Sequence, residues 1–165
     1  MTTPACEVVV RDARMPGEAD VVRTLFEEYA AAIGVDLCFQ GFAEELATLS
    51  GKYALPGGCL LVAGNAGIHG CIALRPLAVE PGGRRIGEVK RLYVRPSARG
   101  TGAGRALARA LIARARAQRY AELKLDTLNT MHAARELYAS LGFRECAPYY
   151  VNPLPDVAYL SLALA

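Results

Sequence analysis

One feature of the sequence limits the possible folds of this chain more than any other: a strand that leads into a glycine-rich turn and then a helix. The strand is predicted over 86–94 and ends at Arg95-Pro96, because proline cannot continue a central ladder. The turn contains Arg99-Gly100-Thr101-Gly102-Ala103-Gly104, and a helix is predicted over 102–119. Free N–H groups at a helix start bind anions, and glycines let the backbone approach phosphate oxygens closely. The segment therefore predicts a phosphate cradle.

Three kinds of phosphate-binding turn can be compared with this one. A Walker A loop ends in Gly-Lys-Ser/Thr, whereas here Gly104 is followed by Arg105, which excludes that class. The dinucleotide fingerprint G-x-G-x-x-G is matched by Gly100 and Gly102, but its third glycine position holds Arg105. That fingerprint also belongs early in a repeated βαβ pattern, which this sequence lacks. The third pattern, Arg/Gln-x-x-Gly-x-Gly/Ala after a strand, is matched completely by Arg99, Gly102 and Gly104.

The rest of the chain reads as short helices and strands around one sheet. Apolar residues spaced three and four apart predict helices over 19–33, 42–49 and 131–141, the last of them stopped by Gly142. Apolar runs between turns predict further strands over 7–11, 59–63, 68–74, 121–126, 143–146 and 157–164, with a hairpin turn at 64–67. This order indicates a single α/β (α+β) domain over 1–165, with a mixed, largely antiparallel central sheet flanked by helices.

Composition narrows the class of protein. The chain has 165 residues, of which 53% are hydrophobic, so one domain with a real core fits better than a disordered chain. No apolar run approaches the ~20 residues of a membrane span, and the N-terminus lacks the pattern of a signal peptide, so a cytoplasmic protein is expected. Five cysteines without a close pair indicate buried, reduced thiols, and two histidines without neighbouring ligands indicate no metal site.

Arginines are concentrated in one part of the chain, although the net charge is only +3. Ten of them lie between residues 84 and 119. Such a cluster can bind nucleic acid, or it can be the solvated face of one helix beside a site for a small polyanion. The second interpretation is preferred, because the cluster is centred on the glycine-rich turn. No nucleic-acid partner and no membrane partner are therefore expected.

A second stretch adds a specific signal. Ala134-Arg135-Glu136-Leu137-Tyr138-Ala139-Ser140-Leu141-Gly142-Phe143 has the form A-x-x-L-Y-x-x-L-G-F. Together with the turn at 99–105, it resembles the two signatures of the GNAT superfamily of N-acetyltransferases. The distance between them fits a helix, a strand and a helix, and the resemblance is strongest over 86–146. It implies acetyl-CoA as the cofactor, CoA as a product, and a primary amine of a small molecule or peptide as the acceptor.

The resemblance also implies roles for individual residues. Tyr138 matches the tyrosine that commonly protonates the departing CoA thiolate, and Glu88 matches a carboxylate that is sometimes the general base. Asn129 is the candidate to replace an asparagine that usually contacts the cofactor, because the usual position holds Met131 here. Backbone groups of the strand end and the turn are expected to bind the cofactor: Leu92, Tyr93, Val94, Arg99, Gly100, Thr101, Gly102, Ala103, Gly104 and Arg105.

Several residues keep an ordinary structural interpretation beside the functional one. Tyr138 can be a core residue with a satisfied hydroxyl, and Glu88 can be a partner of Lys90 on the same face of the strand. The histidines, His69 and His132, are expected to be packed or exposed rather than bases. Near the N-terminus, core positions are expected for Tyr29, Phe39 and Phe42. Loops often carry specificity, so acceptor contacts are assigned to Tyr149, Tyr150 and Asn152.

The predicted reaction is direct attack of the amine on the acetyl group in a ternary complex. No cysteine occupies a recognisable nucleophile position, which disfavours an acyl-enzyme route. The rival from another class is a non-catalytic acyl-CoA sensor that retains the cofactor turn, and a weaker rival is a nucleic-acid-binding protein. The identity of the amine, the length of the acyl chain, and the choice between a monomer and a homodimer stay open.

Overall fold

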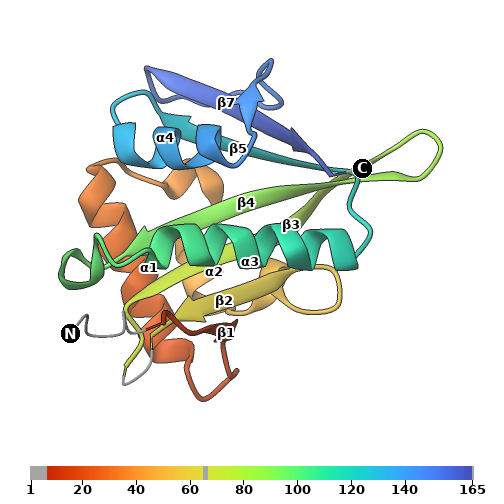
Figure 1. Cartoon of the computed structure of the whole chain (residues 1–165). Coiled ribbons are helices and arrows are strands. Elements are labelled where there is room, and N and C mark those ends of the chain that lie inside the picture. The colour runs from red at the N-terminus through yellow and green to blue at the C-terminus, as the bar shows by residue number, and fades with distance from the viewer. Residues whose placement is uncertain (1–6, 65–66, 165) are drawn as a thin grey trace, which may run out of the picture.

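The computed structural model describes residues 7–64 and 67–164 and contains one seven-stranded sheet with helices on both faces (Figure 1). The strand order is β1-β2-β3-β4-β5-β7-β6. The strands are β1 Val10–Asp12, β2 Cys59–Ala63, β3 Gly70–Glu80, β4 Arg84–Val94, β5 Glu122–Leu128, β6 Arg144–Glu145 and β7 Val157–Ala163. The helices are α1 Ala19–Ile33, α2 Phe42–Ala47, α3 Ala103–Ala117 and α4 His132–Ser140, and short 3₁₀ turns are η1 Cys38–Gln40, η2 Gly51–Tyr53 and η3 Pro96–Ala98. The predicted fold class is confirmed.

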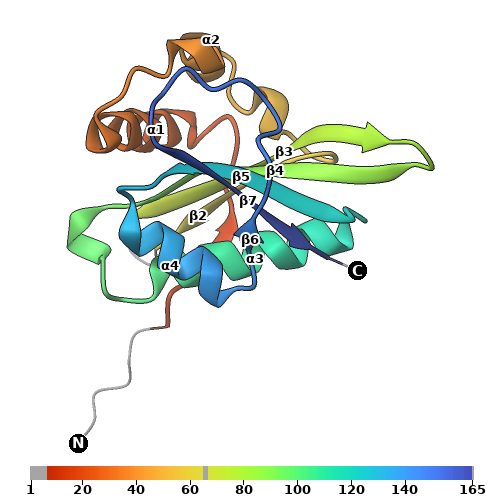
Figure 2. The same cartoon turned by 90° about the horizontal axis from the view of Figure 1, so that it is seen from above.

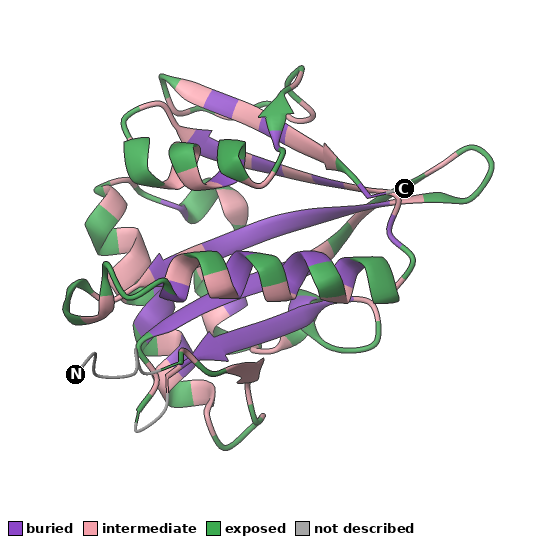
Figure 3. Ribbon diagram, viewed as in Figure 1, coloured by how far each residue is buried: buried purple, intermediate pink, exposed green. Residues whose placement is uncertain are grey.

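The helices divide between the two faces of the sheet (Figure 2). On one face, α1 contributes Val22, Leu25 and Phe26 to a buried cluster with Tyr53. On the other face, α3 packs Leu107 and further apolar residues against β2, β3 and β4. Because both faces are covered, every residue of β2 is buried, as Figure 3 shows for the central strands. The core therefore lies on both sides of β2, β3 and β4.

Among the strands of residues 7–64 and 67–164, only β4 and β5 pair in parallel, and this pair separates halfway along its length. Pairing begins at Ile86 with Glu122 and ends at Glu88 with Lys124. Beyond that point β4 continues to Val94 and β5 continues to Leu128, and Figure 1 shows the two strands diverging. On their other edges both strands stay paired, β4 with β3 and β5 with β7. The divergence leaves backbone groups of both strands available to a ligand.

A bulge sits on β4 where the strands have separated. Cys71 pairs with Tyr93 and Ala73 pairs with Lys90, so Arg91 and Leu92 both face the single residue between them on β3. Arg91 has a φ of 60°, a left-handed conformation that is uncommon for a residue with a side chain. Bulges redirect side chains and are found next to active sites. Here the bulge turns the end of β4 relative to β5.

Several predicted boundaries were wrong. The strand predicted over 68–74 continues to Glu80, through Pro76, because a register shift between Pro76 and Ala78 accommodates a residue without an N–H group. The strand predicted over 7–11 is found at Val10–Asp12, and the two-residue β6 replaces a strand predicted over 143–146. The turns η1 and η2 carry no periodic signal and were not predicted. The hairpin turn predicted at 64–67 lies partly outside the described residues.

Two predictions about burial also fail in part. Phe39 is 37% exposed rather than in the core, because it lies on the short turn η1 instead of on a helix. Cys59 and Cys71 are buried free thiols as expected, but Cys38 is exposed and Cys146 is half-buried, while Cys6 lies outside the described residues. Among the helices of the described chain, none is long and apolar enough to cross a membrane. In residues 7–64 and 67–164, no three His, Cys, Asp or Glu side chains gather as they would around a metal ion.

Candidate active site

A groove of about 620 Å³ opens where β4 and β5 separate. The end of β4 forms one wall through Leu92, Tyr93 and Val94, and α4 with the preceding loop forms the opposite wall. Helix α1 contributes Tyr29, Ala32 and Ile33 to the lining of the groove. The apolar side chains of the groove and the unpaired edge of β4 suit a long, flexible arm that carries amide groups. The three β4 residues predicted to bind a cofactor through their backbone thus line one groove.

The glycine-rich turn lies at the mouth of this groove. Gly100 and Gly102 have φ angles of 79° and 87°, and a methyl group placed on either would meet nothing within 4 Å. Gly102 is the N-cap of α3, no side chain caps that helix, and Gly104 in its first turn lines the groove with Arg99. Free N–H groups at a helix start and a backbone open to a close approach fit a pyrophosphate. The turn residues therefore fit the diphosphate of acetyl-CoA.

Gly102→Val is expected to weaken acetyl-CoA binding about tenfold or more, equal to ~1.4 kcal/mol or more. The side chain would project into the space beside the helix start, where the diphosphate must come close to the backbone. The measurement is the dissociation constant by calorimetry, with the melting temperature followed separately. Unchanged affinity for acetyl-CoA would contradict the position assigned to the diphosphate.

Gly82→Val is a matched control for this substitution. Gly82 has a φ of 89° and open surroundings, so valine meets the same backbone strain there as at Gly102. It lies in the hairpin between β3 and β4, at the opposite end of β4 from the groove residues Leu92 to Val94, and Figure 1 shows this hairpin extending beyond the sheet. Both variants should lose similar stability, and only Gly102→Val should lose affinity for acetyl-CoA.

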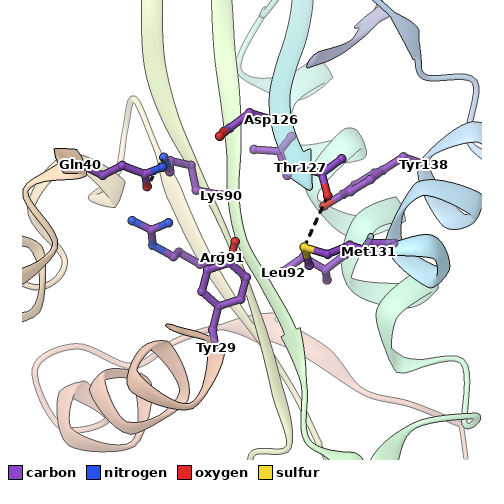
Figure 4. Close-up of a pocket in the computed structure, with 11 residues that line it drawn as sticks. Tyr29, Gln40, Lys90, Arg91, Leu92, Asp126, Thr127, Met131 and Tyr138 are labelled. Carbon is purple, nitrogen blue, oxygen red and sulfur yellow. Dashed lines mark hydrogen bonds between the residues drawn. The ribbon is translucent and has the colours of Figure 1, made fainter. Parts of the chain in front are cut away.

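Beyond the groove, a small chamber of about 40 Å³ occupies the point where the strands part (Figure 4). Tyr29, Leu92 and Met131 line both the groove and the chamber, so the two adjoin. Tyr138 lines the chamber and is 6% exposed, with its ring packed edge-on against Phe143 at 5.3 Å between ring centroids. The predicted catalytic tyrosine thus lies at the closed end of the groove.

The environment of Tyr138 keeps its hydroxyl protonated. Burial raises the pKa of Tyr138 well above its ordinary value, and nearby Tyr29 and Asp126 raise it further. Among the described residues, none forms a hydrogen bond with this hydroxyl, and Figure 4 shows it beside Thr127, which donates a hydrogen bond to Met131 Sδ at 3.6 Å. A protonated phenol without a protein partner is available to donate to a ligand in the chamber.

Glu88, predicted as a general base, is held by other side chains. It is 1% exposed and lies at the last β4–β5 pair. Its Oε1 accepts from Arg75 Nε at 2.6 Å, and its Oε2 accepts from the Tyr149 hydroxyl at 2.6 Å. Burial alone would raise the pKa of Glu88, but Lys90, Arg75 and Tyr149 together lower it. A carboxylate with both oxygens occupied and a lowered pKa is poorly suited to accept a proton.

Asn129 is not brought to the groove, contrary to its predicted contact with the cofactor. Its side-chain amide donates to Asp156 Oδ1 at 2.9 Å, and its backbone N–H donates to the Asp156 carbonyl. These bonds turn the side chain toward the loop before β7. Its chain neighbours Thr130 and Met131 line the groove instead. In the sequence, Asn129 lies only two residues before Met131, where the cofactor contact was expected. The tight turn before α4 decides which of these neighbouring side chains face the groove.

Three polar residues of the chamber, Gln40, Lys90 and Asp126, were not predicted to belong to the site. Charged residues are seldom buried unless they are paired or functional, so Lys90 in a strand predicted to be central was a usable signal. Two of the residues predicted to contact the acceptor, Tyr150 and Asn152, bind Asp126 and so reach the chamber indirectly. Figure 2 shows their loop running from β6 over the face that carries α2.

A buried ion pair fixes the bulge beside the chamber. Arg91 donates to both oxygens of Glu45, with Nε at 2.8 Å and Nη2 at 3.1 Å, and the side chains are 1% and 2% exposed. Tyr53 also donates to Glu45, at 2.9 Å, and Lys52 lies at 3.1 Å from it. Glu45 belongs to α2, so the pair connects the helix layer above the chamber to the bulge of β4.

Comparisons with known proteins agree with this geometry. The family described as "Acetyltransferase (GNAT) domain" matches residues 56–145. An uncharacterized N-acetyltransferase of Schizosaccharomyces pombe is 38% identical over 162 residues, with 96% of each chain covered.

Solved structures share the fold. A GNAT-family acetyltransferase from Staphylococcus aureus superposes with a TM-score of 0.76 at 18% identity, covering 96% of this chain and 100% of that one. A protein from Salmonella typhimurium, described as an acetyltransferase and solved with its cofactor acetyl-CoA, gives a TM-score of 0.74 at 22% identity, covering 96% and 94%. The family match and the relative in fission yeast establish the identity: the chain belongs to the GNAT family of acetyl-CoA-dependent N-acetyltransferases.

Proposed function

We propose that this protein transfers an acetyl group from acetyl-CoA to a primary amine, by direct attack within a ternary complex. The observation that carries the proposal is the divergence of β4 and β5 after Glu88, because it creates a groove and a chamber that meet at Leu92. A cofactor arm in the groove and an amine in the chamber would bring the two reactants together without an enzyme-bound intermediate.

The division of roles follows from the two cavities. The turn at 99–104 and the start of α3 hold the diphosphate, and the backbone of Leu92 to Val94 orients the arm. When bound, acetyl-CoA supplies the acetyl group as a thioester. The chain's own residues orient the amine, exclude water and supply protons. This arrangement favours an enzyme over a binding module, because a sensor has no need for a second polar chamber beside the arm.

Tyr138 is proposed as the acid that protonates the leaving thiolate. Its hydroxyl is protonated, faces the chamber and has no protein partner in the described chain. Glu88 is proposed to hold Arg75 and Tyr149 in place instead of acting as the base. Cysteine does not enter this mechanism. Burial raises the pKa of Cys71 to about 12, and Cys71 Sγ donates to the Arg91 carbonyl.

The test is release of free thiol from acetyl-CoA in the presence of a panel of primary amines. An enzyme should release thiol with at least one amine and form the matching N-acetyl product, identified by its mass. A sensor would bind acetyl-CoA, raise its own melting temperature and release no thiol with any amine. Acetylation of the protein itself without an amine would instead overturn direct attack in a ternary complex.

A further inference from the structure

A lysine and an aspartate line the chamber without forming a direct ion pair with each other. Lys90 comes from β4 and Asp126 from β5, and Figure 4 shows the Asp126 carboxylate pointing from β5 toward the side of β4 that carries Lys90. No ion pair joins them in the described part of the chain, although Lys90 is buried and Asp126 is half-buried. Charges in such places are normally paired. Neither residue has an opposite charge within hydrogen-bonding distance, so the chamber can accept a ligand that supplies one.

Lys90 has no carboxylate within hydrogen-bonding distance. Its Nζ donates to the neutral carboxamide of Gln40 at 2.9 Å, and the nearest carboxylate, Glu88, lies at 3.9 Å and is already paired with Arg75. Its side chain is 6% exposed. Burial lowers the pKa of Lys90 to about 8, with Glu88 and Asp126 offsetting part of the effect. At neutral pH most Lys90 side chains therefore remain charged, with spare N–H donors.

Asp126 shows the complementary arrangement. Its Oδ2 accepts hydrogen bonds from the Tyr150 hydroxyl at 2.7 Å and from the Asn152 amide at 3.1 Å. Both donors are neutral, and they hold the carboxylate at one oxygen. The other oxygen receives no hydrogen bond from the described residues, and the carboxylate lines the chamber together with Tyr138. A carboxylate fixed at one oxygen and open at the other suits an ammonium group.

We propose that the acceptor is an amino acid, with its ammonium group on Asp126 and its carboxylate on Lys90. This inference rests on the proposed function and names the substrate class of the same site. An amine on Asp126 lies in the chamber with Tyr138 and beside Leu92, where the groove ends. A chamber of about 40 Å³ has room for the ammonium and carboxylate groups, so the remainder of the acceptor points outward, toward η1 and α2. The neighbouring ion pairs, Glu88 with Arg75 and Glu45 with Arg91, stay intact.

The test compares each amino acid with its own primary amide. The amide keeps the amine and the side chain and removes only the negative charge. Its amine also loses its proton more readily, which by itself favours the amide. At neutral pH, we expect kcat/KM for at least one amino acid to exceed that of its amide by about tenfold or more, the scale of one specific charged contact. Equal or faster acetylation of every amide would overturn the proposal.

Two substitutions test whether the preference for an amino acid over its amide depends on Lys90 and Asp126. Lys90→Met keeps the length of the side chain and should raise KM for the amino acid about tenfold, with KM for the amide and affinity for acetyl-CoA unchanged. Asp126→Asn should lower kcat/KM about tenfold for both acceptors, because both carry the amine. The matched control is Lys124→Met, which removes a lysine from β5 that lies outside the chamber lining and should change neither value.

The outcomes separate the two proposals. Thiol release with amines but without a preference for carboxylates would overturn the amino-acid acceptor and leave the proposed function standing. No thiol release with any amine would overturn both. Lys90→Met should fold, because a lysine whose pKa is lowered in the folded state opposes folding in its charged form. If it does not, Lys90→Gln must show the same loss of preference, and an unchanged preference in that variant would contradict the proposal.

Discussion

Glu45→Gln is expected to lower the free energy of unfolding by about 3 to 5 kcal/mol, the cost of breaking a buried ion pair on one side. Glu45 accepts both hydrogen bonds of Arg91, and the two side chains are 2% and 1% exposed. Burial would raise the pKa of Glu45, but Arg91 and Lys52 lower it, so the carboxylate is charged at neutral pH. The neutral amide would leave the Arg91 guanidinium buried without an opposite charge.

Urea unfolding measures this change: the urea concentration at half-unfolding should fall, while the dependence of the unfolding free energy on urea concentration stays constant. Glu44→Gln is the matched control, because Glu44 is the exposed neighbour on the same helix and should change stability by no more than about 0.5 kcal/mol. Replacing Glu45 and Arg91 together with methionine should recover much of the loss, since no unpaired charge remains. A cost below about 1 kcal/mol for Glu45→Gln would mean that water or the new amide oxygen compensates the guanidinium.

Tyr138→Phe is expected to lower kcat by about 100-fold or more, the usual scale for the loss of a positioned general acid. The substitution keeps the ring that packs against Phe143 and removes only the hydroxyl. Because no described residue bonds that hydroxyl, stability and affinity for acetyl-CoA should stay close to those of the unmodified protein. Steady-state thiol release on the best amine gives kcat, and calorimetry gives the affinity separately.

Tyr120→Phe provides the opposite pattern as a control. Tyr120 donates a hydrogen bond to the Gly57 carbonyl and does not line the groove or the chamber. Loss of this hydrogen bond should lower the free energy of unfolding by about 1 kcal/mol and leave kcat unchanged. If Tyr138→Phe keeps its full kcat, Tyr138 is a packing residue and another group protonates the thiolate. A loss of acetyl-CoA affinity together with kcat would mean that the hydroxyl holds the cofactor.

The sequence by itself determined the features that depend on neighbouring residues. Free N–H groups at the start of α3 and the positive φ angles of Gly100 and Gly102 are encoded within a few consecutive residues. The same holds for Tyr138, which a helical signature places four residues before Gly142. Apolar spacing also gave the order of the main elements, because helix and strand periods are local properties. A phosphate cradle and a nearby tyrosine could therefore be predicted without a structure.

Only the tertiary structure decided how the charged side chains are paired. Arg91 reaches Glu45 across 46 positions of the chain, and Tyr149 reaches Glu88 across 61. In the sequence, Glu88 was a candidate base and Arg91 one of many arginines near a turn. The fold gives both of them close partners of opposite charge or hydrogen-bond donors, whereas Lys90 and Asp126 have only neutral groups within hydrogen-bonding distance. A charge interacts with whatever the fold places within a few ångströms of it, and that neighbourhood is set by packing between distant elements.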